Sequence, residues 1–380
     1  MARTPGLFDM DERLRRLSDL GDQLEAFAAV ADFEVFRPEL DAALAYGDGA
    51  KGGRPPFDPV MMFKILVIQA CNDLSDDRVE FLINDRLSFM RFLGLGLTDK
   101  VPDAKTVWAF RERLTRAGAI DGLFARFDRA IREAGYIPMA GQIVDASLIS
   151  APRQRNTEAE KVEIKAGRVP PAWRDKPAKL AQKDRDARWT LVFGKARLRA
   201  DGTKHADVAI PVFGYKSHAG IDRRHGFIRK WDVTDASRHD GRMLRRGLLD
   251  ATNTGATVWA DNAYRSRANE AFMAKHGFRS QVHHRKPKGR PMAPHIRRGN
   301  AGRSKIRAGV EHVFARQKGP MGLFIRTIGL ARARVKIGMA NIAYNITRLV
   351  WQERRRALAE PHRYPEHRRR QRRTGLLPCH

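Results

Sequence analysis

Hydrophobic residues recur at helical spacing through the first third of the chain. Asp58 and Pro59 have the residue types of an N-cap and a first helical position. The twelve residues that follow, 60–71, are apolar except for Lys64 and Gln69. This pattern predicts a buried helix, because a helix that is apolar nearly all round has no face to present to water.

A second helix is predicted over 104–114, where Asp103 can cap the first turn and Val107, Phe110 and Leu114 form one stripe. Residues 1–135 are therefore expected to form a helical domain. Such a domain could dock on DNA through a basic face, or it could only pack against the rest of the protein. The pattern leaves both interpretations open.

From about residue 138 the pattern changes to short strands that alternate with helices. Residues 141–150 are rich in β-formers, and 214–237 reads as two strands about a turn at Gly226. The remaining expected elements are a helix at 237–251, a strand within 256–264, a helix at 266–276, a strand at 278–284 and helices at 304–318 and 331–356. This order indicates an α/β domain over 138–351, with a mixed sheet covered by helices.

Three stretches are expected to be irregular. Residues 151–188 are polar and contain Pro170, Pro171 and Pro177, which predicts an insertion or a long flexible loop, and the polar insertion is expected to extend to about 210. Residues 285–307 hold nine Lys and Arg side chains and no acid. The segment 352–380 also holds nine arginines, and we expect a basic tail that is disordered beyond the last helix.

The net charge suggests what the protein binds. The chain has 380 residues, and 72 Lys and Arg against 43 Asp and Glu give a formal charge of +29. An excess of this size repels itself, and its usual reason is a polyanionic partner, most often nucleic acid. With 42% apolar or aromatic residues the chain can still build a core.

Several classes of protein are excluded or disfavoured. Two cysteines cannot form a disulfide scaffold, and no Cys/His spacing suits zinc. No apolar run reaches the roughly 18 residues of a spanning helix, so no membrane partner is expected. The N-terminus lacks the apolar stretch of a signal peptide, and we expect a cytoplasmic protein with reduced thiols.

Three carboxylates lie within apolar sequence. Asp145 follows Ile143 and Val144 in an expected strand, Asp261 ends a short apolar run, and Glu311 lies beside the apolar stripe of an expected helix. A buried carboxylate must be paired or bound to a metal. Ion pairing with the surrounding basic residues is one interpretation for each acid. If the three converge at one sheet edge, they could instead bind Mg²⁺.

The sequence around these acids resembles the DDE transposases of bacterial insertion sequences, most closely the insertion-sequence family numbered five. The resemblance covers about 54–115 and 140–351. Its blocks are RPPFDPVMMFKILVIQACNDLSDDRVEFLINDRLSFMRFLGL, VPDAKTVWAFRERL, IVDASLISAPRQ, GYKSHAGID, VTDASRHD, VWADNAYRS, RSKIRAGVEHVFARQK and ANIAYNITRLV.

The resemblance implies a ribonuclease H-like fold with Asp145, Asp261 and Glu311 as catalytic, metal-binding residues. Two Mg²⁺ ions, which Mn²⁺ can replace, would assist hydrolysis at the element's ends. The freed 3′-hydroxyl would then attack target DNA in a second transesterification. The implied partners are double-stranded DNA, as element ends and as target, and further copies of the chain in a homodimer or larger assembly. Such a protein would be associated with the nucleoid.

The third block has a specific spacing in related transposases: Tyr, two residues, Arg, three residues, Glu, six residues, Lys. Arg307, Glu311 and Lys318 fit it, whereas Ser304 stands at the Tyr position. Arg307 and Lys318 are therefore expected to contact DNA phosphates. The alternative is a ladder of surface salt bridges along the helix.

Weaker signals add further candidates. Arg303 and Lys305 belong to the basic run and are expected DNA contacts. Tyr264 and Arg265 follow Asp261 and could touch DNA, or they could be a packed tyrosine and a solvated arginine. His239 and Asp240 could orient the site from behind, or could simply begin a helix.

Two other functions remain open beside transposition. A ribonuclease H-like nuclease would cut DNA without joining it, and an inactive relic would only bind DNA. The presence of all three carboxylates argues against the relic, but the sequence does not separate a nuclease from a transposase.

Overall fold

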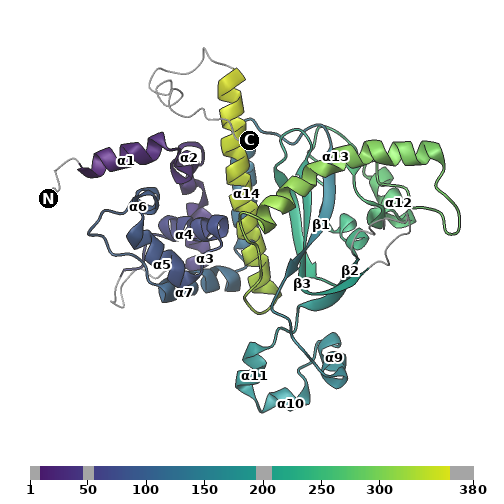
Figure 1. Cartoon of the computed structure of the whole chain (residues 1–380), viewed down its shortest axis with the longest axis horizontal. Coiled ribbons are helices and arrows are strands. Elements are labelled where there is room, and N and C mark those ends of the chain that lie inside the picture. The colour runs from purple at the N-terminus through teal and green to yellow at the C-terminus, as the bar shows by residue number, and fades with distance from the viewer. Residues whose placement is uncertain (1–8, 46–54, 194–207, 360–380) are drawn as a thin grey trace, which may run out of the picture. The chain divides into compact units, whose positions relative to one another are not determined.

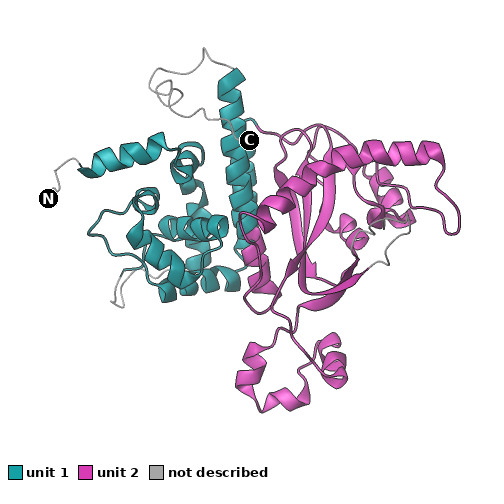
Figure 2. Cartoon of the chain, in the orientation of Figure 1, with its two compact units in different colours: residues 1–135, 339–380 teal, residues 136–338 magenta. Residues whose placement is uncertain are grey.

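The computed structural model describes residues 9–45, 55–193 and 208–359 (Figure 1). The chain divides into two compact units, which Figure 2 shows in different colours. Unit 1 comprises 1–135 and 339–380, and unit 2 comprises 136–338. The sequence had placed residues up to 351 with the catalytic domain, whereas the structure groups them from Met339 onward with the helical unit. Of the expected disordered tail, 352–359 is helical and the rest lies outside the described residues.

Unit 1 is helical, as predicted. Its helices are α1 (Asp9–Asp19), α2 (Gln23–Val30), η1 (Phe33–Phe36), α3 (Arg37–Leu44), α4 (Pro59–Asn72), α5 (Asp76–Asp85), α6 (Leu87–Leu93), α7 (Ala104–Arg116), α8 (Ile120–Glu133) and the later part of α14 (Leu330–Ala359). No helix within the described ranges is both long enough and apolar enough to cross a membrane.

The two helices expected in this unit begin where their caps predict. The Asp58 carboxylate accepts a hydrogen bond from the Met61 amide at 2.8 Å, and the Asp103 carboxylate accepts one from the Thr106 amide at 2.7 Å. Nine residues of α4 are buried, in keeping with its apolar sequence. Gln69 is among them, and it donates to Asp76 at 2.8 Å, so its polar group is satisfied inside the core.

Unit 2 is built on the mixed sheet that the sequence predicts. Its strands are β1 (Gln142–Ser150), β2 (Arg188–Phe193), β3 (Ala209–Asp222), β4 (Ile228–Asp235), β5 (Thr257–Trp259) and β6 (Arg279–Ser280). The order is β2-β3-β1-β5-β6, with β4 also paired to β3. The pairs β1–β3, β2–β3 and β3–β4 are antiparallel, whereas β1–β5 and β5–β6 are parallel.

The turn between β3 and β4 is held by a buried carboxylate. Asp222 is fully buried, accepts hydrogen bonds from the amides of His225 and Phe227 at 2.6 and 3.2 Å, and pairs with the buried Arg229 at 3.0 Å. Gly226 supplies the left-handed backbone, with φ +75°, that this turn needs. The predicted bend at Gly226 is confirmed.

Helical elements cover the two faces of the sheet. On one face, η2 (Asp240–Arg242), η3 (Leu244–Arg246), η4 (Asn262–Tyr264) and α12 (Arg267–Lys275) surround a core that includes Val144 and Val258. On the other face lies α13 (Pro294–Lys318), where Gly309 packs so closely on Ile143 that a Cβ would lie 3.3 Å from its Cδ1. The adjacent residues Ile143 and Val144 of β1 therefore pack on opposite faces of the sheet.

Three sequence expectations were wrong in part. The helix at 237–251 is replaced by the short helices η2 and η3, because Gly241 makes a tight tertiary contact and Gly247 turns left-handed at φ +93°. Helix α13 starts at Pro294, ten residues before the expected start. The strand expected at 278–284 is paired only over β6.

The insertion expected over about 151–210 is more ordered than a flexible loop and includes the sheet strand β2, whereas 194–207 lie outside the described residues. It contains α9 (Glu158–Lys165), α10 (Pro171–Arg174) and α11 (Pro177–Gln182), which form a small cluster beyond the end of the sheet (Figure 1). The prolines read as loop signals stand at helix starts, where the missing amide does no harm. Trp173 is fully buried and donates to Glu160 at 2.6 Å, so the cluster has a core of its own.

The inserted segment leaves and rejoins the sheet at one place. Ser150, the last residue of β1, and Arg188, the first of β2, both pair with Gly214 on β3. A Cβ on Gly214 would lie 2.2 Å from the Ile149 carbonyl oxygen, so the backbones meet too closely for any side chain.

We predict that His218 makes the stability of unit 2 depend on pH. It is fully buried on β3, 2.9 Å from the Thr234 hydroxyl, and burial lowers its pKa from 6.5 to about 4. Below pH 6.5 the unfolded chain protonates this histidine, whereas the folded protein keeps it neutral down to about pH 4. The free energy of unfolding is therefore highest above pH 6.5 and falls by up to about 3 kcal/mol as the pH drops from 6.5 to 4. Urea unfolding across this range measures the loss. The dependence of the unfolding free energy on pH should become weaker in His218→Asn. It should persist in His312→Asn, which changes an exposed histidine.

Candidate active site

The pairing of β1 with β5 places two carboxylates near each other. These strands run parallel with Gln142 opposite Val258 and Ile143 opposite Trp259. Asp145 and Asp261 each follow the last of these pairs by two residues, and the charge of Asp261 acts on Asp145, so the two carboxylates lie near each other. Residues two apart on a strand share a face, so Asp145 belongs to the face of Ile143, where α13 packs.

Asp145 lies within β1, and its side chain is only 15% exposed. One carboxylate oxygen accepts from the Ala146 amide at 2.8 Å, and the other accepts from Arg307 Nη1 at 2.6 Å. Burial raises the pKa of Asp145 from 3.8 to about 6, and the nearby charge of Asp261 adds to this effect while Arg307 opposes it. The site therefore holds a carboxylate whose negative charge is incompletely compensated.

Asp261 stands where β5 ends and η4 begins. It is the N-cap of η4, and its carboxylate accepts from the Ala263 amide at 2.8 Å. Since that bond uses one oxygen, the turn that terminates the strand also orients the carboxylate.

Glu311 approaches the pair from α13. Its side chain is 61% exposed, and Arg307, one turn earlier, donates to it from Nη2 at 3.1 Å. The Arg307 guanidinium thus bridges Glu311 and Asp145. Within the described ranges, no three Asp, Glu, His or Cys side chains are grouped closely enough to bind one metal ion. Arg307 links Asp145 and Glu311, and the charge of Asp261 acts on Asp145, but the three carboxylates are not gathered around one point.

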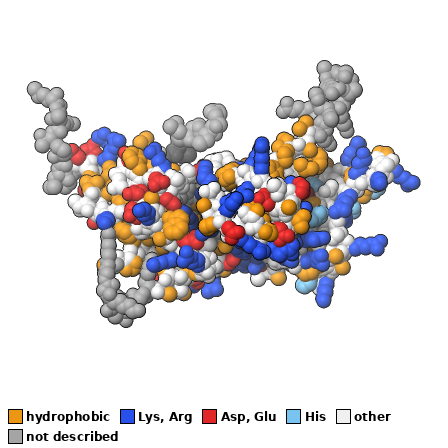
Figure 3. Space-filling view, turned by 90° about the horizontal axis from the view of Figure 1, so that it is seen from below, with side chains coloured by type: hydrophobic (Ala, Val, Ile, Leu, Met, Phe, Trp, Pro, Cys, Tyr) orange, Lys and Arg blue, Asp and Glu red, His pale blue; other side chains and the backbone are white. Residues whose placement is uncertain are grey.

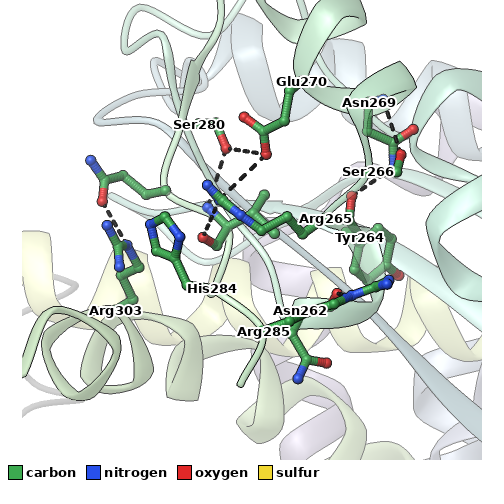
Figure 4. Close-up of polar contacts among 12 residues, drawn as sticks. Asn262, Tyr264, Arg265, Ser266, Asn269, Glu270, Ser280, His284, Arg285 and Arg303 are labelled. Atoms are coloured by element: carbon green, nitrogen blue, oxygen red, sulfur yellow. Dashed lines mark hydrogen bonds and ion pairs between the residues drawn. The ribbon is translucent and has the colours of Figure 1, made fainter. Parts of the chain in front are cut away.

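The loop that follows Asp261 is tied to its surroundings by several polar contacts (Figure 4). Arg265 donates to the Val282 carbonyl at 3.3 Å and pairs with Glu270 at 3.6 Å. Arg285 donates to the Asn262 carbonyl at 3.0 Å. Arg265, considered above as a DNA contact, is thus already engaged within the protein.

Tyr264 is fully buried, and burial raises its pKa well above the ordinary value. The sequence left two interpretations of Tyr264, a DNA contact or a packed tyrosine. The structure agrees with the packed tyrosine, because a side chain without exposed surface cannot touch DNA. It belongs to the core beneath the sheet, together with Val144 and Met273.

Among the other candidate DNA contacts, some side chains are hydrogen-bonded within the protein and others are exposed to solvent. Arg303 donates to Gln281 at 2.9 Å and to Asn300 at 3.2 Å. Lys305 and Lys318 are exposed on α13. Figure 3 shows Lys and Arg side chains spread over one face of the molecule, where they outnumber Asp and Glu.

His239 and Asp240 lie at the start of η2. The His239 ring accepts from the Gly241 amide at 3.1 Å, so it caps its own turn. Asp240 pairs with Lys216 of β3 at 2.8 Å. Ser304, which stands where related transposases have Tyr, is exposed, and its hydroxyl lies 3.4 Å from the His283 ring.

Sequence reasoning missed two residues that the structure places beside these turns. Lys216 pairs with Asp240 from a different strand, and Asn269 bridges two loops from α12. Lys216 lies in the block GYKSHAGID, but the partners of both residues come from other segments of the chain, so no local pattern could have identified these contacts.

The strand order, with one aspartate within β1, a second just after the neighbouring β5 and a glutamate on the covering helix, is that of a ribonuclease H-like fold. The family model described as a transposase DDE domain matches residues 136–346. A second model, a transposase domain (DUF772), matches 12–113. The chain belongs to the DDE transposase family and is a DNA transposase. Members of this family depend on divalent cations.

A solved structure gives a weaker match. It is the cryo-EM structure of a piggyBac transposase synaptic complex with hairpin DNA, 12% identical in sequence. The match covers 95% of this chain and 80% of that one, with a TM-score of 0.41. This similarity is too low to assign residues.

We predict that Arg307 stabilises the fold chiefly through Asp145. In a chelating buffer, Arg307→Met should lower the free energy of unfolding by about 1–3 kcal/mol, because it leaves a buried carboxylate unpaired. In the background Asp145→Asn the same change should cost much less. Glu311→Gln, at an exposed acid, should cost under about 0.5 kcal/mol. Urea unfolding of the wild type, the two single variants Arg307→Met and Asp145→Asn and their double variant measures the coupling, and equal costs of Arg307→Met in both backgrounds would contradict the prediction.

Proposed function

We propose that the protein cleaves DNA at the ends of an insertion element and joins the freed 3′-hydroxyl ends to target DNA. Asp145, Asp261 and Glu311 act as ligands of two Mg²⁺ ions, for which Mn²⁺ can substitute. The observation that carries this proposal is the parallel pairing of β1 with β5, which brings the segments that carry Asp145 and Asp261 together beside the basic helix α13.

The donor chemistry of the three acids suits a divalent cation, although the three side chains are not grouped around one point in this structure. All three side chains offer the hard oxygen ligands that Mg²⁺ prefers. The raised pKa of Asp145 reflects burial and a like-charged neighbour, and a positive charge relieves both. When bound, the ions activate the attacking oxygen and stabilise negative charge at the phosphate. Arg307 supplies one positive charge between Asp145 and Glu311, which are ligands from two different elements.

The chain's own cations bind the DNA backbone. Lys305 and Lys318 are exposed on the helix that carries Glu311, and they offer ammonium groups to phosphates beside the acids. Arg307 pairs with Asp145 and Glu311, and its place between them makes its guanidinium a further candidate for a phosphate contact. Tyr264, Arg265 and Arg303 are left out of this role, because each is buried or engaged.

The finer assignments rest on the resemblance. The motif blocks support membership of the insertion-sequence family numbered five. The helical unit is proposed to bind the element's ends, and the protein to act as a homodimer or larger assembly on DNA. Association with the nucleoid follows from the net charge and from the DNA partner.

Replacing any one of the three acids should abolish the chemistry and spare DNA binding. We expect Asp145→Asn, Asp261→Asn and Glu311→Gln each to slow strand cleavage by at least about 10²–10³-fold, because each removes charge stabilisation at the phosphate. The assay incubates each variant with Mg²⁺, a duplex carrying the gene's flanking DNA and a second target duplex. Glu158→Gln, at an exposed acid of the insertion, is the matched control.

The same assay separates the alternatives. Cleavage and joining by the wild type, lost in the three variants, support the proposal. Cleavage without joining indicates a nuclease. Binding without chemistry in the wild type indicates an inactive copy and contradicts the proposal.

Metal affinity should rise with pH through about 6. Since only a deprotonated Asp145 can be a ligand, affinity should fall roughly tenfold per pH unit below its pKa of about 6 and level off above it. Calorimetric titration with Mn²⁺ across this range tests the expectation. Asp145→Asn should bind weakly at every pH, and a wild-type affinity that does not vary with pH would refute the role of Asp145.

The salt dependence of DNA binding should distinguish exposed cations from engaged ones. Lys305→Gln and Lys318→Gln should each reduce the slope of log K against log salt by about 0.9, since each phosphate contact releases about one counterion. Arg303→Gln should leave the slope unchanged, because its guanidinium is bound to Gln281 and Asn300. Anisotropy titrations at several salt concentrations give these slopes. An equal change in all three variants would contradict the distinction between the exposed lysines and the hydrogen-bonded Arg303.

A further inference from the structure

Two turns that each begin with an aspartate meet beneath the active site. One is η2, headed by Asp240, and the other is η4, which Asp261 caps. A Cβ on Gly241 would lie 2.4 Å from the Ala263 carbonyl oxygen, so the two backbones touch and only glycine fits between them. The position of η4, and of the carboxylate at its head, therefore depends on η2.

A single amide joins these turns. Asn269 lies on α12 and is 1% exposed. Its Nδ2 group donates one proton to the Gly241 carbonyl at 2.8 Å and the other to the Tyr264 carbonyl at 2.7 Å. Figure 4 shows Asn269 close to Tyr264 and Ser266.

The side-chain amide of Asn269 also destabilises the fold, because one of its polar atoms is left unsatisfied. The Asn269 Oδ1 atom is buried and has no hydrogen-bond partner among the described residues. An unsatisfied buried acceptor destabilises a fold, and a leucine of similar size would avoid that penalty. What leucine could not supply is the pair of N–H donors that bridges the two turns.

We infer that Asn269 is a positioning residue that sets the orientation of the Asp261 carboxylate. It fixes the far end of η4 through Tyr264, and its bond to Gly241 holds η2 against Ala263. The Ala263 amide in turn binds the Asp261 carboxylate at 2.8 Å. This inference rests on the proposed function of Asp261 as a metal ligand. The residues that hold a ligand in place are usually worth about 10–100-fold in metal affinity.

The chain contains a matched control. Asn253 accepts from the amides of Gly141 and Gly255 at 3.0 and 2.9 Å and donates to the Gly141 carbonyl at 3.0 Å. It lies next to the amino ends of β1 and β5, whereas Asn269 lies beside the loop at the carboxyl end of β5. Both asparagines bridge backbones around the same strands, but only Asn269 is near Asp261.

The test compares Asn269→Leu and Asn253→Leu in calorimetric Mn²⁺ titration and in the Mg²⁺ dependence of cleavage. Asn269→Leu should weaken Mn²⁺ binding by about tenfold or more and raise the half-saturating Mg²⁺ concentration similarly, with DNA affinity unchanged. Asn253→Leu should leave metal affinity within about twofold of wild type, although it lowers thermal stability. Equal shifts in the two variants, or no shift in Asn269→Leu, would overturn the inference.

Gly241→Ala provides an independent variant if Asn269→Leu does not fold. The added Cβ must push Ala263 away, so it should weaken Mn²⁺ binding in the same way while Asn269 is intact. Metal affinity equal to wild type in Gly241→Ala would contradict the inference. Failure of the proposed function looks different: Asp261→Asn would then bind Mn²⁺ as tightly as the wild type does.

Discussion

The parallel pairing of β1 with β5 is the constraint on which the rest of the catalytic unit depends. Only two residue pairs define it, yet their register fixes which side chains of the two strands are neighbours. Because strands alternate their faces, the same register that buries Val144 and Val258 on one side turns Asp145 to the other. The hydrophobic core and the placement of Asp145 are thus specified together, and a slip by one residue would lose both.

The second requirement is electrostatic. A buried carboxylate beside another negative charge needs a cation, and α13 brings Arg307 to Asp145 from 162 residues away. A strongly basic chain can bind DNA with side chains that remain exposed, such as Lys305, and can use others to neutralise its own acids. The positive charge of this protein therefore serves both the ligand and the fold.

The sequence predicted what depends on local pattern. The caps at Asp58 and Asp103, the strand around Asp145 and the turn at Gly226 were all foreseen, because each depends on neighbouring residues. The three acids were identified by resemblance, and the structure does not test their roles.

What the sequence did not predict depends on contacts between distant segments. Residues 237–251 have helical periodicity, but the close approach of Gly241 to Ala263 replaces the helix with short turns. The partners of Arg265 and Arg303 lie on other segments, so side chains that looked available for DNA are engaged. Asn269 acts only through carbonyls of two other loops, which no spacing in the chain records.

The meeting of Ser150 and Arg188 at Gly214 has a consequence for how such proteins can be compared. Because both ends of the inserted segment pair with the same residue, the segment can change in length without moving the strands around it. A longer segment costs little extra free energy, since the entropy of loop closure grows only slowly with length. The number of residues between Asp145 and Asp261 is therefore free to vary while their distance in space stays fixed. Relatives are better aligned by the short segments around each acid than by the spacing between the acids.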